Sequence, residues 1–93
     1  MKMSPSELIE WTGTKLDSNL FKINDADVPQ YVKAALLVDV GAMGGIHALL
    51  TGLSDGYFTS EFVAAVVAQM ELYQNTIDRL ILRENTLRNT LAH

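Results

Sequence analysis

The sequence predicts an all-α domain of three helices, in which a short N-terminal helix packs on an antiparallel hairpin of two longer helices. Apolar residues recur every three to four positions, polar turn-forming runs separate the helical segments, and the stretch 60–91 contains neither proline nor glycine. The chain of 93 residues is long enough for one domain, and we expect residues 1–93 to form it. Its core must be thin, because a chain of this size buries only about two-thirds of its unfolded surface.

The first helix is predicted from Pro5 to about Leu16. Ser4 is placed to cap its free amides, and Pro5 occupies the first turn, where a missing N–H does no harm. Glu7 follows the cap by three residues and completes the pattern of a capping box. The run DSNLFKINDAD, residues 17–27, is rich in Asp and Asn, so we expect a turn-rich connection there.

The second helix is predicted to begin after Asp27 and to end near Leu50 or Leu53. Pro29 would lie in its first turn, and Gln30 follows Asp27 by three residues, which is an Asp-led variant of the capping box. The cap and the proline together favour a helix start at this point.

The run TGLSDGYFTSE predicts a turn between the second and third helices. Gly52 and Gly56 can take a positive φ there, and Thr59 is placed to cap the following helix. That third helix is predicted from Ser60 to about Leu91, a length of roughly 45 to 50 Å.

Apolar residues along the third helix alternate in spacing between three and four, broken only where Glu84 takes an apolar position, which is a heptad pattern. It comprises Val63, Val66, Met70, Tyr73, Ile77, Leu80, Leu87 and Leu91. From Gln74 onward one face of the helix is polar and carries Asp78, Arg79, Arg83, Arg88 and Asn89. We therefore expect the C-terminal half of this helix to project beyond the second helix and to pair with another copy of the chain.

Small residues of the second helix fall along one line, here called the glycine stripe: Ala34, Gly41, Gly45, Ala48 and Gly52. Each interior glycine costs a helix about 1 kcal/mol relative to alanine, so close packing must compensate. We expect another backbone to cross here, either that of the third helix or that of the same helix in a second copy. A glycine-induced kink at a ligand site is an alternative.

A membrane span is a further alternative for residues 34–53, since about 20 apolar residues cross a bilayer and Gly41-x-x-x-Gly45 is a spacing used between membrane helices. Asp39 and His47 count against it, because each is expensive at bilayer depth. We expect both to be structural side chains. They lie too far apart along one helix to bond directly, and no motif supplies the nucleophile that catalysis would need.

Arg79 and Arg83 lie one turn apart, and a guanidinium group suits carboxylates and phosphates. They predict a possible anion site, with His47 and Lys33 as further candidates. No metal site is expected, since the chain has no cysteine and two histidines, and the run NDAD lacks the glycine and distant glutamate of a calcium loop.

The net charge of −4 argues against a nucleic-acid partner. We expect a cytoplasmic, non-enzymatic protein–protein interaction or accessory module without a cofactor, which acts as a homo-oligomer, a dimer first, and binds another protein. Small acidic helical proteins of this kind are common among phage and mobile-element accessory and inhibitor proteins. The alternatives are an oligomer that sequesters a nucleotide-like anion and a small membrane protein. Predicted interface residues are Gly41, Gly45, Ala48, Met70, Tyr73, Ile77, Leu80, Leu87 and Leu91.

Overall fold

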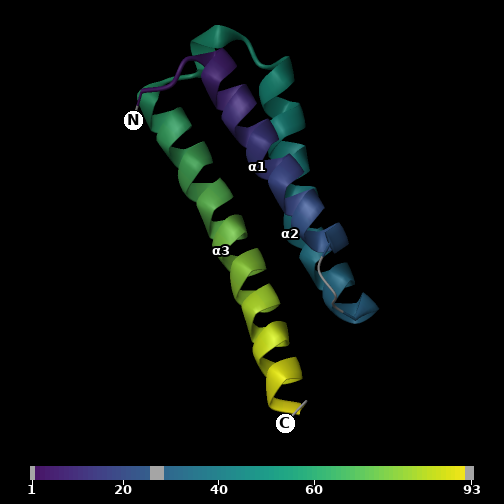
Figure 1. The fold of residues 1–93 in the computed structure, drawn as a ribbon. Coiled ribbons are helices and arrows are strands. Elements are labelled where there is room, and N and C mark those ends of the chain that lie inside the picture. Colours follow the sequence, from purple (N-terminus) through teal and green to yellow (C-terminus); the bar gives the residue numbers. More distant parts are fainter. Residues whose placement is uncertain (1, 26–28, 92–93) are drawn as a thin grey trace.

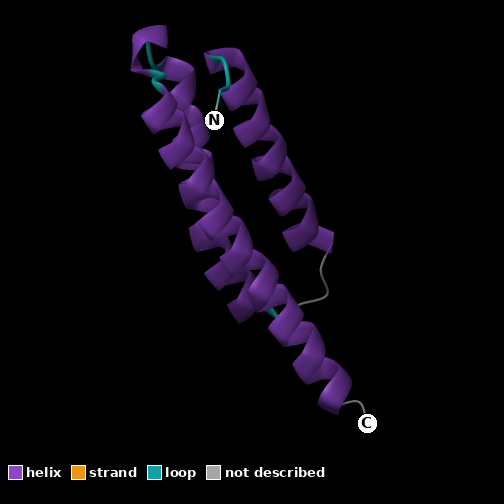
Figure 2. Cartoon of the chain, turned by 90° about the vertical axis from the view of Figure 1, so that its left-hand side faces the viewer, coloured by secondary structure: helices purple, strands orange, loops and turns teal. Residues whose placement is uncertain are grey.

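Three helices run side by side along a rod of 55 × 20 × 16 Å in the computed structural model, which describes residues 2–25 and 29–91 (Figure 1). They are α1 (Pro5–Asp25), α2 (Gln30–Gly52) and α3 (Ser60–Leu91), with the short 3-10 turn η1 (Asp55–Tyr57) before α3. Within these ranges the chain forms no strand. The predicted all-α, three-helix fold is therefore confirmed, and Figure 2 shows the last turns of α3 standing beyond the other helices.

The first helix is longer than the sequence predicted, because α1 continues past Leu16 to Asp25. The predicted turn-rich connection is thus wrong over its first part. Asn19 explains the difference: its side-chain amide donates to the Lys15 carbonyl one turn earlier (2.8 Å) rather than opening a turn. Ile23, at 3% exposure, adds apolar burial to the same segment. With 21 residues against 23 in α2, α1 is not a short helix.

Local capping follows the sequence closely at two helix starts. The Ser4 backbone amide donates to Glu7 Oε1 (2.9 Å), and the Glu7 amide donates to Ser4 Oγ (3.1 Å), which is a complete capping box. The Ser4 amide, and secondly its hydroxyl, hold the pKa of the Glu7 carboxyl below its usual value. At α3, the Phe62 amide donates to Thr59 Oγ1 (3.1 Å).

Two other predicted end features have different outcomes. Asp27, the predicted cap of α2, lies outside the described residues; Pro29 is the N-cap, in an extended conformation without a side-chain cap bond. The positive φ expected at Gly52 and Gly56 is wrong, since no described residue has one. Leu53 leaves α2 in an extended conformation instead, and the 3-10 turn then reverses the chain.

The core is formed by apolar side chains from all three helices, most of them on α2 and α3. Its largest fully buried members are Leu8, Leu36, Met43, Leu50, Met70 and Ile77. Met70 and Ile77 were predicted at an interface between copies, and this is a correction: both are completely buried inside the single chain. The heptad pattern of α3 is occupied by α1 and α2 along its first half, and only its end is free, with Leu87 and Leu91 exposed.

Truncation at Ile77 tests this assignment. Ile77→Ala should lower the free energy of unfolding by about 2–5 kcal/mol, the usual cost of a cavity in a core, measured by urea denaturation. Leu72→Ala is the matched control on the same helix, because Leu72 is 57% exposed, and it should cost less than about 1 kcal/mol. Equal effects of the two substitutions would place Ile77 outside the core.

Candidate functional site

The outward side of α2 is the most unusual surface of the described chain. It consists of eight exposed residues, here called the α2 face: Ala34, Leu37, Val38, Gly41, Gly45, Ala48, Leu49 and Gly52. Leu37, Val38 and Leu49 are 51%, 72% and 60% exposed. Every exposed residue between positions 30 and 52 is uncharged. The α2 face is therefore a continuous apolar surface rather than a few scattered apolar side chains.

The polarity of α2 is inverted relative to an ordinary surface helix, whose charged residues face water. Its charged and imidazole side chains, Lys33, Asp39 and His47, are all partly buried, and His47 contacts Thr12 of α1. The buried apolar residues of α2, such as Leu36 and Met43, lie on its inner side. The helix is thus apolar on both sides, and only one side has a partner within the chain.

The glycine stripe lies within the α2 face, open to solvent. A Cβ atom added at Gly41, Gly45 or Gly52 would meet nothing within 4 Å. The predicted close crossing with the third helix is therefore wrong. The same crossing with a second copy stays a prediction, and three of its predicted contact residues, Gly41, Gly45 and Ala48, are exposed.

Among the described helices, α2 alone is long and apolar enough to cross a membrane by length and composition. The packing of α1 against α2 disfavours a membrane span, because α1 exposes Glu10 and Asp17 on its own outer side. A span by α2 within this fold would carry both carboxylates toward the hydrocarbon, at a cost of several kcal/mol.

His47 pairs with Thr12 of α1 rather than with Asp39. The Thr12 hydroxyl, which is fully buried, donates to the Ile9 carbonyl (3.0 Å), and its oxygen lies 2.9 Å from His47 Nδ1. Since a hydroxyl carries one proton, both bonds form together only when His47 holds a hydrogen on Nδ1. A Cβ at Gly13 would lie 3.0 Å from the His47 ring, so this glycine makes room for the imidazole. The arrangement fits a structural role.

A second buried polar cluster joins α1 to α3, and the sequence did not predict it. Asn19, completely buried, donates to Gln74 Oε1 (2.7 Å), and Gln74 donates in return to Asn19 Oδ1 (2.8 Å). Gln74 also donates to Asp78 Oδ1 (3.0 Å), which Lys22 reaches at 3.2 Å. The Asn19 amide also approaches the Met43 sulfur (3.7 Å), so Met43 of α2 and Gln74 of α3 lie at similar heights in the bundle.

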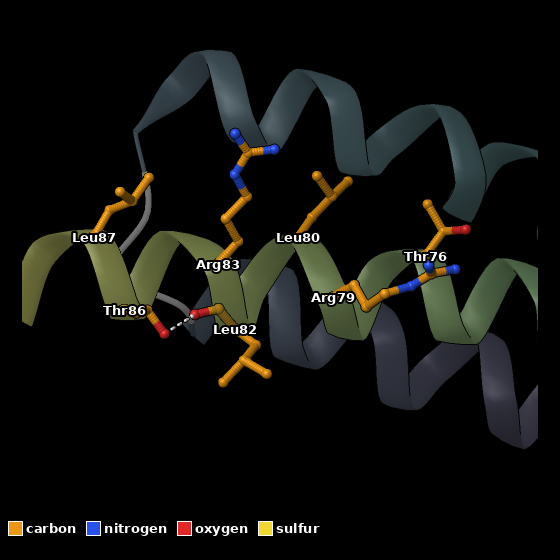
Figure 3. A pocket seen from close by; sticks show the side chains of 7 residues that line it. All are labelled: Thr76, Arg79, Leu80, Leu82, Arg83, Thr86 and Leu87. Carbon is orange, nitrogen blue, oxygen red and sulfur yellow. Dashed lines mark hydrogen bonds between the residues drawn. The ribbon is translucent and has the colours of Figure 1, made fainter.

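Arg79 and Arg83 flank an open groove of about 660 Å³ on α3 (Figure 3). Its other lining residues are Thr76, Leu80, Leu82, Thr86 and Leu87, so the groove combines two guanidinium groups with three leucines. Leu80, Arg83 and Leu87 rise from one side of the helix, and Leu82 points from another. His47 and Lys33, predicted as further anion ligands, do not line it. In the described part of the chain no cluster of acidic, His or Cys side chains is arranged to hold a metal ion.

Comparison with known proteins finds no matching family, no matching curated protein and no matching solved structure. Function must therefore be argued from the surfaces of the chain itself.

The Asn19–Gln74 pair should be energetically coupled. Asn19→Ala and Gln74→Ala, combined in a double-mutant cycle by chemical denaturation, should show a coupling of about 1 kcal/mol or more, since the fully buried Asn19 amide and the partly buried Gln74 amide each lose a partner. The control is the Lys22–Asp78 pair, whose side chains are about half exposed, and its coupling should be smaller. Additive effects of Asn19→Ala and Gln74→Ala would show that the pair does not fix the α1–α3 packing.

Proposed function

We propose that this protein is a non-enzymatic helical interaction module that assembles with copies of itself through the α2 face. The observation that carries the proposal is the inverted polarity of α2, whose exposed residues are all uncharged while Lys33, Asp39 and His47 are partly buried. An apolar surface that continues along a whole helix is typical of an interface.

A second copy suits this surface better than the other occupants considered. Apolar side chains on both partners are buried together, and the open positions at Gly41 and Gly45 let two backbones approach closely. The net charge of −4 disfavours an anionic lipid surface. The α2 face runs along the 23 residues of α2, a length of about 35 Å.

In this proposal the assembled protein is soluble in the cytoplasm and acts as an accessory protein. The charged outer sides of α1 and α3, with residues such as Glu10, Asp17 and Arg79 exposed, remain outside the interface. A partner protein would be recognised by this remaining surface, so assembly and partner binding would use different sides of the bundle.

Substitution at Gly45 separates assembly from folding. Without detergent, the wild-type chain should sediment as a discrete dimer in analytical ultracentrifugation. Gly45→Leu should be a monomer, because the side chain fills the space that the second backbone needs. The thermal midpoint of the monomeric Gly45→Leu variant should be no lower than that of the wild-type monomer. Leucine is favoured over glycine within a helix by up to about 1 kcal/mol, and a side chain at position 45 meets no neighbour in the chain.

The matched control is Ala68→Leu, an equally bulky change at an exposed position of α3, which should leave the dimer intact. A wild-type monomer at every concentration, or a Gly45→Leu variant that still dimerises, would contradict the proposal. Recovery of the protein only in detergent would favour the membrane alternative instead.

The second candidate function is an oligomer that sequesters a nucleotide-like anion in the groove beside Arg79 and Arg83. The specific observation is the placing of both guanidinium groups, one turn apart, at the edge of an open apolar groove. Guanidinium forks bind phosphate oxygens, and leucine side chains would contact a base or another apolar part.

Thermal denaturation with ATP and with inorganic phosphate tests this candidate. At a hundredfold excess over the dissociation constant, a ligand should stabilise the protein by about 2.7 kcal/mol. The shift should vanish in the Arg79→Gln/Arg83→Gln variant and persist in Lys33→Gln, since Lys33 lies outside the groove. An unchanged midpoint with both ligands would remove the candidate.

A further inference from the structure

We infer that two copies pair in an antiparallel arrangement through the α2 face, about a two-fold axis at the height of Met43. This inference rests on the proposed function and specifies its geometry. Three features of the chain support it: the sizes of the side chains along α2, the heights of the helices and the distribution of charge.

Side-chain size along the α2 face is nearly symmetric about Met43, with three of four pairs matched. In an antiparallel two-fold pair, residues at equal distances on either side of the axis come to the same height. Ala34 corresponds in this way to Gly52, Leu37 to Leu49, and Gly41 to Gly45, while the fourth pair, Val38 with Ala48, is unequal in size. Small residues thus meet small residues along the line of contact, while the exposed leucines flank it. Ala34 and Gly52 are 18 positions apart, or about five helical turns, so they share one line of the helix.

The ends of the rod differ in charge. All three arginines of the chain follow position 78, while the opposite end carries acidic residues around the turn before α3. The basic group is Arg79, Arg83 and Arg88, with Asp78 and Glu84 among them, so residues 78–88 carry a net charge of +1; the acidic group includes Asp55 and Glu61.

The heights of these groups match in an antiparallel pair. Met43 and Gln74 lie at similar heights, because the Asn19 amide contacts the ends of both side chains. Arg83 lies nine residues beyond Gln74, and Gly52 nine residues beyond Met43, so each lies about 14 Å from the axis. The basic end of one copy then comes level with the acidic turn that follows Gly52 of the partner subunit.

Disulfide cross-linking tests the arrangement directly, because the chain has no cysteine. We would prepare Ala34→Cys and Gly52→Cys, one of them with a tag that changes its mass, and oxidise each alone and both mixed. Disulfides need Cα atoms about 4.4–6.8 Å apart. Only the mixture should form a cross-linked dimer in high yield, since identical positions are about 27 Å apart along an antiparallel pair. Ser18→Cys, exposed on α1, measures cross-linking by random collision.

The outcomes separate this inference from the proposed function. Efficient cross-linking of Ala34→Cys with itself and of Gly52→Cys with itself would show a parallel pair, which overturns the inference and keeps the proposed function. If the protein is a dimer in ultracentrifugation but the Ala34→Cys and Gly52→Cys variants cross-link no more than Ser18→Cys, the interface lies elsewhere. This result would also overturn the antiparallel arrangement. A monomer in ultracentrifugation would overturn both.

Discussion

Helix α2 is apolar around most of its circumference, but its two neighbours cover only one side of it. The inner side holds core residues such as Leu36 and Met43, and the outer side exposes Leu37, Val38 and Leu49. A bundle of three helices has no fourth element to cover this outer surface. Burial of apolar surface contributes about 25 cal/mol per Å², so an occupant of the α2 face would add substantially to a core that is thin for its chain length. The arrangement of the remaining elements depends on this one-sided packing.

Specific packing on the inner side comes from polar groups rather than from apolar shape alone. Buried polar side chains are costly unless their hydrogen bonds are made, and here Thr12 with His47 and Asn19 with Gln74 make them across different helix pairs. These bonds fix the height of α1 against α2 and α3, because a shift by one turn would leave a buried amide without its partner. The α2 face, in contrast, carries no charge and no buried bond of this kind, and its partner can be chosen by shape.

Local signals in the sequence predicted the helix starts well. Ser4, Glu7 and Thr59 act within three residues of themselves, so their bonds follow from spacing alone. The end of α1 could not be predicted in this way, since Asn19 favours a turn locally and becomes helical through its bonds to Lys15 and to distant Gln74. The heptad pattern of α3 predicted burial of Met70 and Ile77, but a pattern does not say whether the covering helix belongs to the same chain. The glycine stripe likewise did not say whether the helix that crosses it belongs to the same chain or to a second copy.

Symmetry decides whether covering the α2 face ends the assembly or extends it. A two-fold pair uses the same surface on both copies, so one contact covers both apolar faces and leaves none to recruit a third copy. A head-to-tail contact would join the α2 face to some other surface and leave one apolar face exposed at each end of a growing chain. The outer side of α1 exposes Phe21 (70%), but Glu10 and Asp17 are exposed beside it, so its apolar surface is smaller than the α2 face and is interrupted by carboxylates. The near-symmetric pattern about Met43 therefore favours a closed dimer, in which the inverted polarity of α2 becomes an ordinary buried core between two bundles.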